Sequence, residues 1–136
     1  METLISHPVE EMERIAGSWN QVTVEPHRFG GKEFKFYEAE IGHIHFNGML
    51  DIPFSRAIRD VLLRMGLVKQ HHYLPETGWI SFPMKNNPSS LSRGAKLLRL
   101  SYLFRAKRKG DKSLNINAEL NELNFGTEIN ALLSTS

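Results

Sequence analysis

The stretch KEFKFYEAEIGHIHFNGMLDIP, residues 32–53, decides the fold of this chain. Apolar and polar residues alternate over residues 32–37 and again over residues 41–46, which predicts two β-strands. A short turn separates them, and the dipeptide Asn47-Gly48 is a strong tight-turn signal. The residues after this turn extend the sheet until a proline ends it. Because turns this short join antiparallel neighbours, the stretch predicts an antiparallel sheet.

Further strands and helices flank this stretch. Alternation predicts one strand before it, over residues 22–25, and one after it, over residues 79–82. Helically spaced apolar residues, with capping residues and terminal glycines, predict helices at residues 8–17, 55–66 and 87–110. The order α-β-β-β-α-β-α predicts an α+β fold, with an antiparallel sheet of about four to five strands and helices packed on one face.

The length of 136 residues fits one domain with a sizeable core. We expect residues 1–110 to form a single α+β domain. Residues 111–136 are polar and rich in asparagine, and are predicted to be a C-terminal tail. This tail is either partly helical, around residues 116–123, or mobile.

Composition excludes several classes of protein. The chain has no cysteine, which excludes disulfides, thiolate metal sites and cysteine nucleophiles. Its N-terminus has neither a basic start nor a long apolar run, and no segment reaches the ~20 apolar residues of a spanning helix. We therefore expect a soluble cytoplasmic protein with no membrane partner.

Positive charge is concentrated in one segment of the chain. The net charge is only +2, yet residues 85–112 contain nine basic residues and one acidic residue. Such asymmetry is typical of a nucleic-acid contact and also of a solvated helix end. The candidate nucleic-acid residues are Arg93, Lys96, Arg99, Arg105, Lys107 and Arg108.

Strand alternation divides the side chains between two faces of the sheet. Those predicted to face the helices are Val22, Val24, Phe34, Phe36, Ile44, Phe46, Ile80 and Phe82. Those predicted on the opposite face are Glu25, His27, Lys35, Tyr37, His43, His45, Trp79 and Ser81. A face with three histidines, a tyrosine and a tryptophan is unusual for a solvated surface. It is the predicted location of a functional site.

Three interpretations of this face stay open. His43 and His45 point the same way and can share a metal, with His27 or Asp51 as a third ligand, although no recognised metal motif is present. Alternatively, these histidines donate hydrogen bonds or move protons in a pocket whose wall is Trp79 or Tyr37. In that pocket Arg28 holds an anion. The third interpretation is a homodimer interface.

The remaining candidates carry weaker signals. Asp51 precedes a proline, where a turn or cap role is the default, and His71-His72 are predicted to line a loop. No glycine-rich phosphate loop or serine-hydrolase motif is present, so no cofactor and no metal are assigned. The candidate ligand-binding residues are His27, Arg28, Tyr37, His43, His45, Asp51, His71, His72 and Trp79.

The leading functional hypothesis is a small binding domain, with a histidine and aromatic pocket or a dimer interface on the open sheet face. One alternative is a small enzyme that uses His43 or His45 as acid and base on a small anionic ligand. A second alternative is nucleic-acid binding through the basic segment of residues 85–112.

Four blocks of the sequence resemble one known family. They are PHRFGGKEF (residues 26–34), EIGHIH (40–45), LDIPF (50–54) and HHYLPETGWISF (71–82). These blocks are similar to the bacterial and fungal "luciferase family protein" domain over about residues 8–106. The resemblance carries over no catalytic residue, and no flavin or nucleotide motif accompanies it.

A fainter resemblance is to the YjbR-like small domains. It rests on the order of the elements, on Trp79-Ile80-Ser81 in a strand and on Ser101-Tyr102 in the closing helix. It implies a compact α+β fold.

Overall fold

A computed structural model describes residues 7–27 and 30–134, and its centre is one antiparallel sheet of six strands. In chain order the strands are β1 (Val22–Pro26), β2 (Lys32–Phe36), β3 (Ala39–Ile44), β4 (Met49–Pro53), β5 (Lys69–Gln70) and β6 (Trp79–Pro83). Their order in the sheet is β1-β2-β3-β4-β6-β5, and every pair is antiparallel. The predicted α+β class and antiparallel sheet are confirmed. The sixth strand is β5, whose two residues are too few to show alternation.

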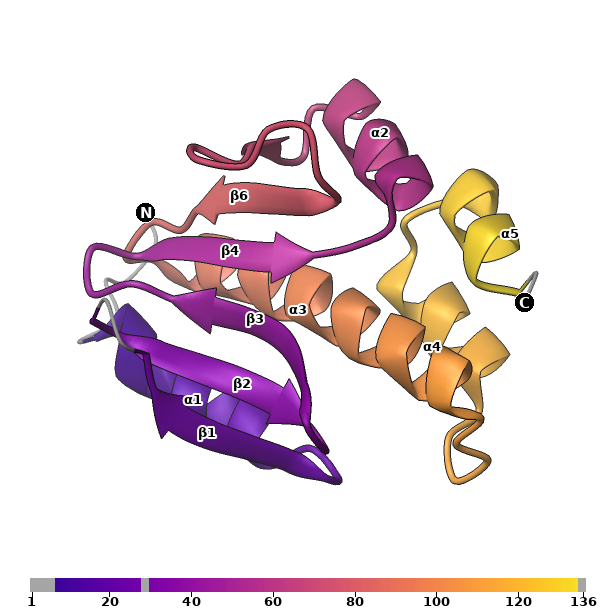
Figure 1. Ribbon diagram of the computed structural model, residues 1–136, viewed down its shortest axis with the longest axis horizontal. Coiled ribbons are helices and arrows are strands. Elements are labelled where there is room, and N and C mark those ends of the chain that lie inside the picture. Colours follow the sequence, from indigo (N-terminus) through magenta and orange to yellow (C-terminus); the bar gives the residue numbers. More distant parts are fainter. Residues whose placement is uncertain (1–6, 28–29, 135–136) are drawn as a thin grey trace.

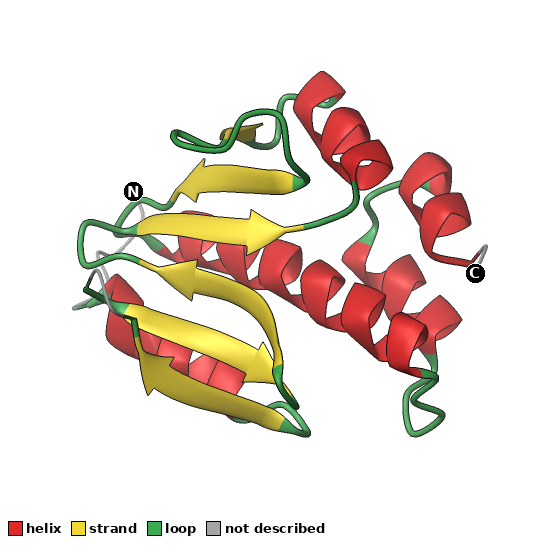
Figure 2. Cartoon of the chain, in the orientation of Figure 1, coloured by secondary structure: helices red, strands yellow, loops and turns green. Residues whose placement is uncertain are grey.

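Five helices accompany the sheet in the described part of the chain. They are α1 (Pro8–Gly17), α2 (Arg56–Arg64), α3 (Pro88–Lys109), α4 (Ile116–Leu123) and α5 (Thr127–Ser134). Figures 1 and 2 show α1 and α3 behind the sheet, so that the other face is left uncovered by helices. None of the helices in residues 7–27 and 30–134 is both long enough and apolar enough to span a membrane.

The predicted capping residues begin two of these helices. The side-chain oxygen of Ser55 accepts a hydrogen bond from the backbone N–H of Ile58 at the start of α2. Asn87 does the same for Ser90 at the start of α3. Each cap satisfies one of the backbone donors that the first turn of a helix leaves without an intrahelical partner.

The core lies between the sheet and the two helices α1 and α3. Its fully buried side chains include Met12, Phe34, Phe36, Ile44, Leu50, Ile52, Ile80, Leu97 and Leu98. Met12 belongs to α1, and Leu97 and Leu98 belong to α3, whereas alternate residues of the strands supply the others, as the period of two requires. The core also contains Tyr102, whose hydroxyl donates to the backbone carbonyl of Asn20. Packing therefore covers one face of the sheet and leaves the other for polar residues.

Two positions predicted from strand parity are wrong. Phe46 was expected to face the helices, yet it is 67% exposed because β3 ends at Ile44 and the chain is already turning. Tyr37 was expected on the open face among the histidines. It has a positive φ of 54° outside β2, and its ring contacts Phe36 and the ammonium of Lys109 instead.

A bulge lies in β3. Phe34 pairs with Gly42 and Lys35 with Glu40, so Ile41 is an extra residue on β3, which begins at Ala39 inside the segment that was predicted to be a turn. The bulge breaks the simple alternation of this strand, and both Ile41 and Ile44 are buried.

The last two helices pack against the rest of the molecule. Contacts join α4 to α3, and α5 to both α4 and α2. Leu120, Phe125, Ile129 and Leu133 are buried there. The guanidinium of Arg99 on α3 binds the carboxylate of Glu119 on α4 at 2.6 Å. A second ion pair, at 2.8 Å, joins Arg64 on α2 to Glu128 on α5. Apolar burial and two short ion pairs thus hold the C-terminal segment to α2 and α3.

Candidate functional site

A row of polar residues crosses the open face of the sheet, the face opposite α1 and α3. The strand register pairs Glu33 with His43, His43 with Asp51, and Asp51 with Ser81. Directly paired residues of antiparallel strands project on the same side of the sheet. Lys69 continues the row, because it pairs with Ser81 from the edge strand β5. The backbone thereby brings residues from five strands into one line.

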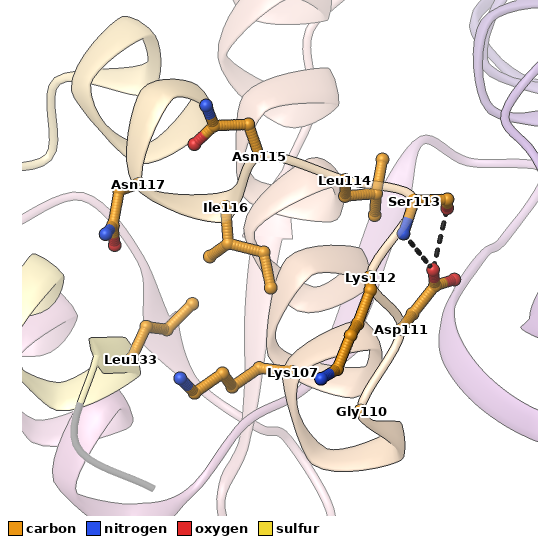
Figure 3. Close-up of a pocket in the computed structure, with 10 residues that line it drawn as sticks. All are labelled: Lys107, Gly110, Asp111, Lys112, Ser113, Leu114, Asn115, Ile116, Asn117 and Leu133. Atoms are coloured by element: carbon orange, nitrogen blue, oxygen red, sulfur yellow. Dashed lines mark hydrogen bonds between the residues drawn. The ribbon is translucent and has the colours of Figure 1, made fainter.

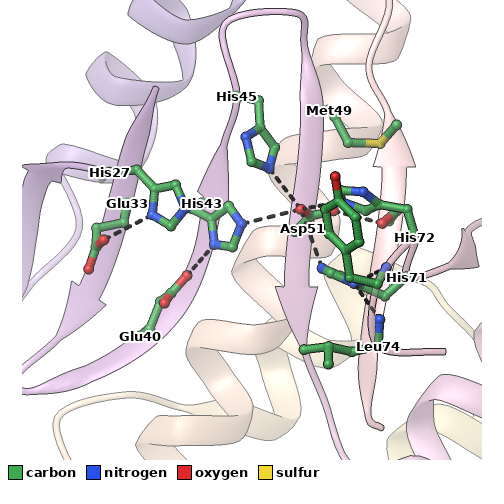
Figure 4. Close-up of polar contacts among 12 residues, drawn as sticks. His27, Glu33, Glu40, His43, His45, Met49, Asp51, His71, His72 and Leu74 are labelled. Carbon is green, nitrogen blue, oxygen red and sulfur yellow. Dashed lines mark hydrogen bonds and ion pairs between the residues drawn. The ribbon is translucent and has the colours of Figure 1, made fainter. Parts of the chain in front are cut away.

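Asp51 is the centre of this row. Its side chain is only 1% exposed, and Ser81 donates its hydroxyl to Oδ1 at 2.7 Å. The other carboxylate oxygen, Oδ2, lies 2.9 Å from Nε2 of His45 and 3.2 Å from Nε2 of both His43 and His72. Nε2 of His71 is 3.5 Å away. Figure 4 shows the imidazole rings of β3 and of the loop after β5 converging on this carboxylate.

One carboxylate oxygen is surrounded by more donors than it can accept. Each carboxylate oxygen offers about two lone pairs, whereas four imidazole nitrogens point at Oδ2. Ordinary hydrogen bonding therefore satisfies only part of this cluster. A cation bound beside Oδ2 would take up some of the imidazole nitrogens that this oxygen cannot accept.

His43 is held between two carboxylates. Its Nδ1 donates to Oε2 of Glu40 at 2.6 Å, and its Nε2 faces Asp51. Burial alone would lower the pKa of His43, but the hydrogen bonds to Asp51 and Glu40 outweigh it and raise the pKa to about 9. Burial alone would raise the pKa of Asp51. The hydrogen bonds from His43, Ser81, His45 and His72 reverse this and hold that pKa well below its usual range.

His71 differs from His43 in two respects: its Nδ1 accepts hydrogen bonds, and its pKa is lowered. Its Nδ1 accepts hydrogen bonds from the backbone N–H groups of Tyr73 and Leu74, at 3.1 and 3.0 Å. A neutral imidazole that accepts at Nδ1 carries its proton at Nε2. Burial lowers the pKa of His71 and outweighs the attraction of the Asp51 carboxylate, which alone would raise it. The lowered pKa favours the neutral form of the ring. His71 therefore donates toward Asp51 and fixes the turn that follows His72.

Aromatic rings line the cluster. The ring of His27 stacks on His43 with centroids 4.0 Å apart, and its Nδ1 lies 3.0 Å from a carboxylate oxygen of Glu33. The ring of Trp79 lies 5.4 Å from that of His43 and 5.8 Å from that of His71. Trp79 therefore forms an apolar wall between the β3 and loop histidines.

The structure brings together most of the predicted ligand-binding residues. His27, His43, His45, Asp51, His71, His72 and Trp79 lie in one cluster. Tyr37 lies apart, and Arg28 falls outside the described residues. Sequence reasoning did not select Glu33, Glu40 or Ser81. Ser81 and Glu33 could have been found from the strand register, which pairs them with Asp51 and His43.

The candidate nucleic-acid residues are spread along α3 in different environments. The guanidinium of Arg99 binds Glu119 and lies 4.4 Å from the ring centroid of Tyr102. Arg105 is half-buried, and burial lowers its pKa. Arg93, Lys96 and Arg108 are exposed, and Lys107 is half-buried. Two of the six candidates are thus engaged in packing within the molecule.

A surface hollow of about 740 Å³ lies elsewhere, at the C-terminal end of α3 (Figure 3). It is lined by Lys107, Lys112 and the residues that lead into α4, and shares no residue with the cluster around Asp51. Its aspartate, Asp111, accepts hydrogen bonds from the backbone and hydroxyl of Ser113. The hollow has no convergent titratable groups, so we place the candidate site at Asp51.

Comparison with known proteins bears on this cluster. No curated protein and no solved structure matches the chain. A family model described as "Luciferase domain" matches residues 38–89. This segment runs from the turn before β3 to the start of α3 and contains Glu40, Asp51, Ser81 and the four histidines that surround the carboxylate. The predicted family resemblance is therefore confirmed over residues 38–89, which match the luciferase domain family.

Proposed function

We propose that this domain binds one divalent transition-metal ion through Nε2 of His43, Nε2 of His45 and Oδ2 of Asp51. The observation that carries the proposal is that these three atoms lie within 4.8 Å of one another, with His43 and Asp51 on paired strands and His45 directly after β3. Two imidazoles and one carboxylate on one side of an ion are a common set of ligands for Fe²⁺ and Zn²⁺, and leave positions open for other ligands.

The separations between the ligand atoms fit such an ion. With bonds of about 2.1 Å, two ligand atoms are roughly 3.0 Å apart at right angles and roughly 3.4 Å apart at tetrahedral angles. The Nε2 atoms of His43 and His45 lie 3.2 and 2.9 Å from Oδ2 of Asp51. Metal binding therefore requires little movement of Asp51 relative to either histidine.

The surrounding hydrogen bonds fit the same assignment. Glu40 accepts the Nδ1 proton of His43, so the proton that a metal ion would replace is the one on Nε2, which faces Asp51. This arrangement of carboxylate, histidine and metal recurs in metal sites, where it orients the ring and raises its basicity. Ser81 fixes the opposite oxygen of Asp51. His71 cannot be a ligand in this geometry, because its Nδ1 accepts two backbone N–H groups and its Nε2 carries the proton.

Zinc titration of metal-stripped protein tests the proposal. Isothermal titration should show one saturable site in the original chain. His43→Ala, His45→Ala and Asp51→Asn should each weaken binding by on the order of 100-fold or more, since each removes one of three ligands. His7→Ala is the matched control, because His7 is outside the group of proposed ligands and should leave the affinity unchanged. Equal zinc binding by all four variants would show that the ion binds elsewhere.

A further inference from the structure

The open positions of the proposed metal site lie toward His72. The side chain of Asp51 is 1% exposed and that of His43 is 11% exposed, whereas those of His45 and His72 are 22% and 40% exposed. Three protein ligands fill only part of the four to six positions of a divalent transition metal. A ligand from solvent therefore reaches the ion from the side of His45 and His72.

His72 stands beside this opening without belonging to the ligand group of His43 and His45. The titratable side chains gather in two sets that share Asp51, one with His43 and His45, the other with His71 and His72. Nε2 of His72 lies 3.2 Å from Oδ2 of Asp51. A group that donates to the metal-bound carboxylate is placed to donate to a neighbouring ligand of the same ion as well.

An aromatic side chain borders the same opening. Tyr73 is 80% exposed, and its ring centroid lies 4.3 Å from that of His72. Leu74, the next residue, is also exposed. The turn that holds both side chains is fixed by the two hydrogen bonds to His71. An apolar group on a metal-bound ligand would pack against this held tyrosine ring.

Charge at the opening favours an anion. A divalent ion with one carboxylate and two neutral imidazoles keeps one positive charge. Lys69 adds a second, because its pairing with Ser81 places it on the same face two strands from Asp51. Within residues 7–27 and 30–134, no ion pair is found for Lys69.

We propose that the metal site takes a small organic carboxylate with an apolar body. Its carboxylate would occupy the open metal position near His72 and Lys69, and its body would contact Tyr73. This proposal rests on the proposed metal-binding function and adds the class of ligand to it.

Cobalt substitution with two carboxylate probes tests the ligand class. Protein loaded with Co²⁺ should change its visible absorption saturably on addition of acetate and of benzoate. Benzoate should bind about tenfold more tightly, because its ring is buried against Tyr73. Tyr73→Ala should abolish this preference without changing the affinity for Co²⁺. Tyr37→Ala is the matched control, because Tyr37 is an exposed tyrosine against Phe36, away from the cluster.

The outcomes separate this proposal from the one on which it rests. Absence of a Co²⁺ site would overturn both. If Co²⁺ binds but neither carboxylate changes its spectrum, the metal proposal stands, and the proposal of an open position that takes a carboxylate is wrong. Equal affinities for acetate and benzoate in the original chain, or a preference for benzoate that survives Tyr73→Ala, would contradict the proposed contact between Tyr73 and the apolar body of the ligand. Lys69→Gln should weaken the binding of both carboxylates about equally. An unchanged affinity would show that Lys69 does not contribute to carboxylate binding.

Discussion

Asp51 is a carboxylate buried in the middle of a sheet, where an ionised group without partners is strongly unfavourable. The hydroxyl of Ser81 and the surrounding histidines supply its partners. We expect Asp51→Ala to lower the free energy of unfolding of the metal-free protein by about 3 kcal/mol, since it leaves these partners without their acceptor. Ser81→Ala removes one hydrogen bond and should lower it by about 1 kcal/mol. Urea denaturation measures both. Equal, small effects would mean that the cluster contributes little to stability.

Glu40 acts on the proposed metal only through His43. Its carboxylate accepts from Nδ1 of His43 at 2.6 Å. Glu40→Gln should weaken zinc binding by about 10- to 100-fold, the usual effect of losing a carboxylate behind a metal-binding histidine. Glu38→Gln is the control, because it removes the same charge two residues away from an exposed position, whereas the hydrogen bond to Nδ1 of His43 comes from Glu40. If the two variants weaken zinc binding equally, Glu40 acts through its charge and not through its hydrogen bond.

Alternation along the sequence predicted correctly which face of the sheet a side chain occupies where the strands are regular, and it failed where they are not. It placed His43, His45 and Ser81 on the open face, as the structure shows. It failed at Tyr37, which follows the last residue of β2 and has a positive φ. Asp51 was interpreted as a turn residue because Pro53 follows, although both belong to β4. The partner strand decides the case of Asp51, and the local signal contains no information about it.

The turn between β1 and β2 depends on a glycine that no other residue can replace. Gly31 has a φ of 88°, and a Cβ there would lie 1.9 Å from the carbonyl oxygen of Ile44. Gly66 has a similar φ of 74° but nothing within 4 Å. Gly66→Ala should therefore lower stability by about 1 kcal/mol, the conformational effect alone. Gly31→Ala should lower it by more than about 3 kcal/mol, because the backbone of β3 must also move. Similar urea midpoints for the two variants would contradict the close approach of this turn to β3.

The elements themselves were largely predictable, and their exceptions have physical reasons. Period-two alternation predicted β1, β2 and β6, and caps predicted the starts of α2 and α3. β5 has only two residues and forms because β6 offers it an edge, a contact invisible in the local sequence. His71 and His72 follow β5 directly, so their position at Asp51 depends on this tertiary pairing. Local sequence thus predicted the regular elements and named His71 and His72 as candidates, but it did not predict their approach to Asp51.

At one side of the molecule, α5 packs against α2. Ile129 and Leu133 are buried where α5 packs. We expect Leu133→Ala to lower the free energy of unfolding by 2–5 kcal/mol, the usual effect of truncating a buried leucine. Met65→Ala is the control, because Met65 is 45% exposed and should change stability by less than about 0.5 kcal/mol. Thermal unfolding followed by far-ultraviolet circular dichroism compares the two variants. A Leu133→Ala protein as stable as the original would show that α5 does not contribute to the core.

The arrangement of the whole molecule also explains where its polar chemistry lies. Helices α1 and α3 cover one face of the sheet and take up its apolar residues (Figure 1). The other face keeps its row of paired polar residues from β2 to β5. The segment matched by the luciferase family model supplies β3, β4, β5 and β6, and with them the histidines and the serine that contact the Asp51 carboxylate among the described residues.

The most direct test is a crystal structure of the zinc-loaded protein with an anomalous difference map collected at the zinc edge. The account predicts one peak about 2.0–2.2 Å from Nε2 of His43, Nε2 of His45 and Oδ2 of Asp51. It also predicts that His71 keeps its hydrogen bonds to the turn and does not bind the ion. A map without a peak at Asp51, with the imidazole rings still gathered around the empty carboxylate, would contradict the account.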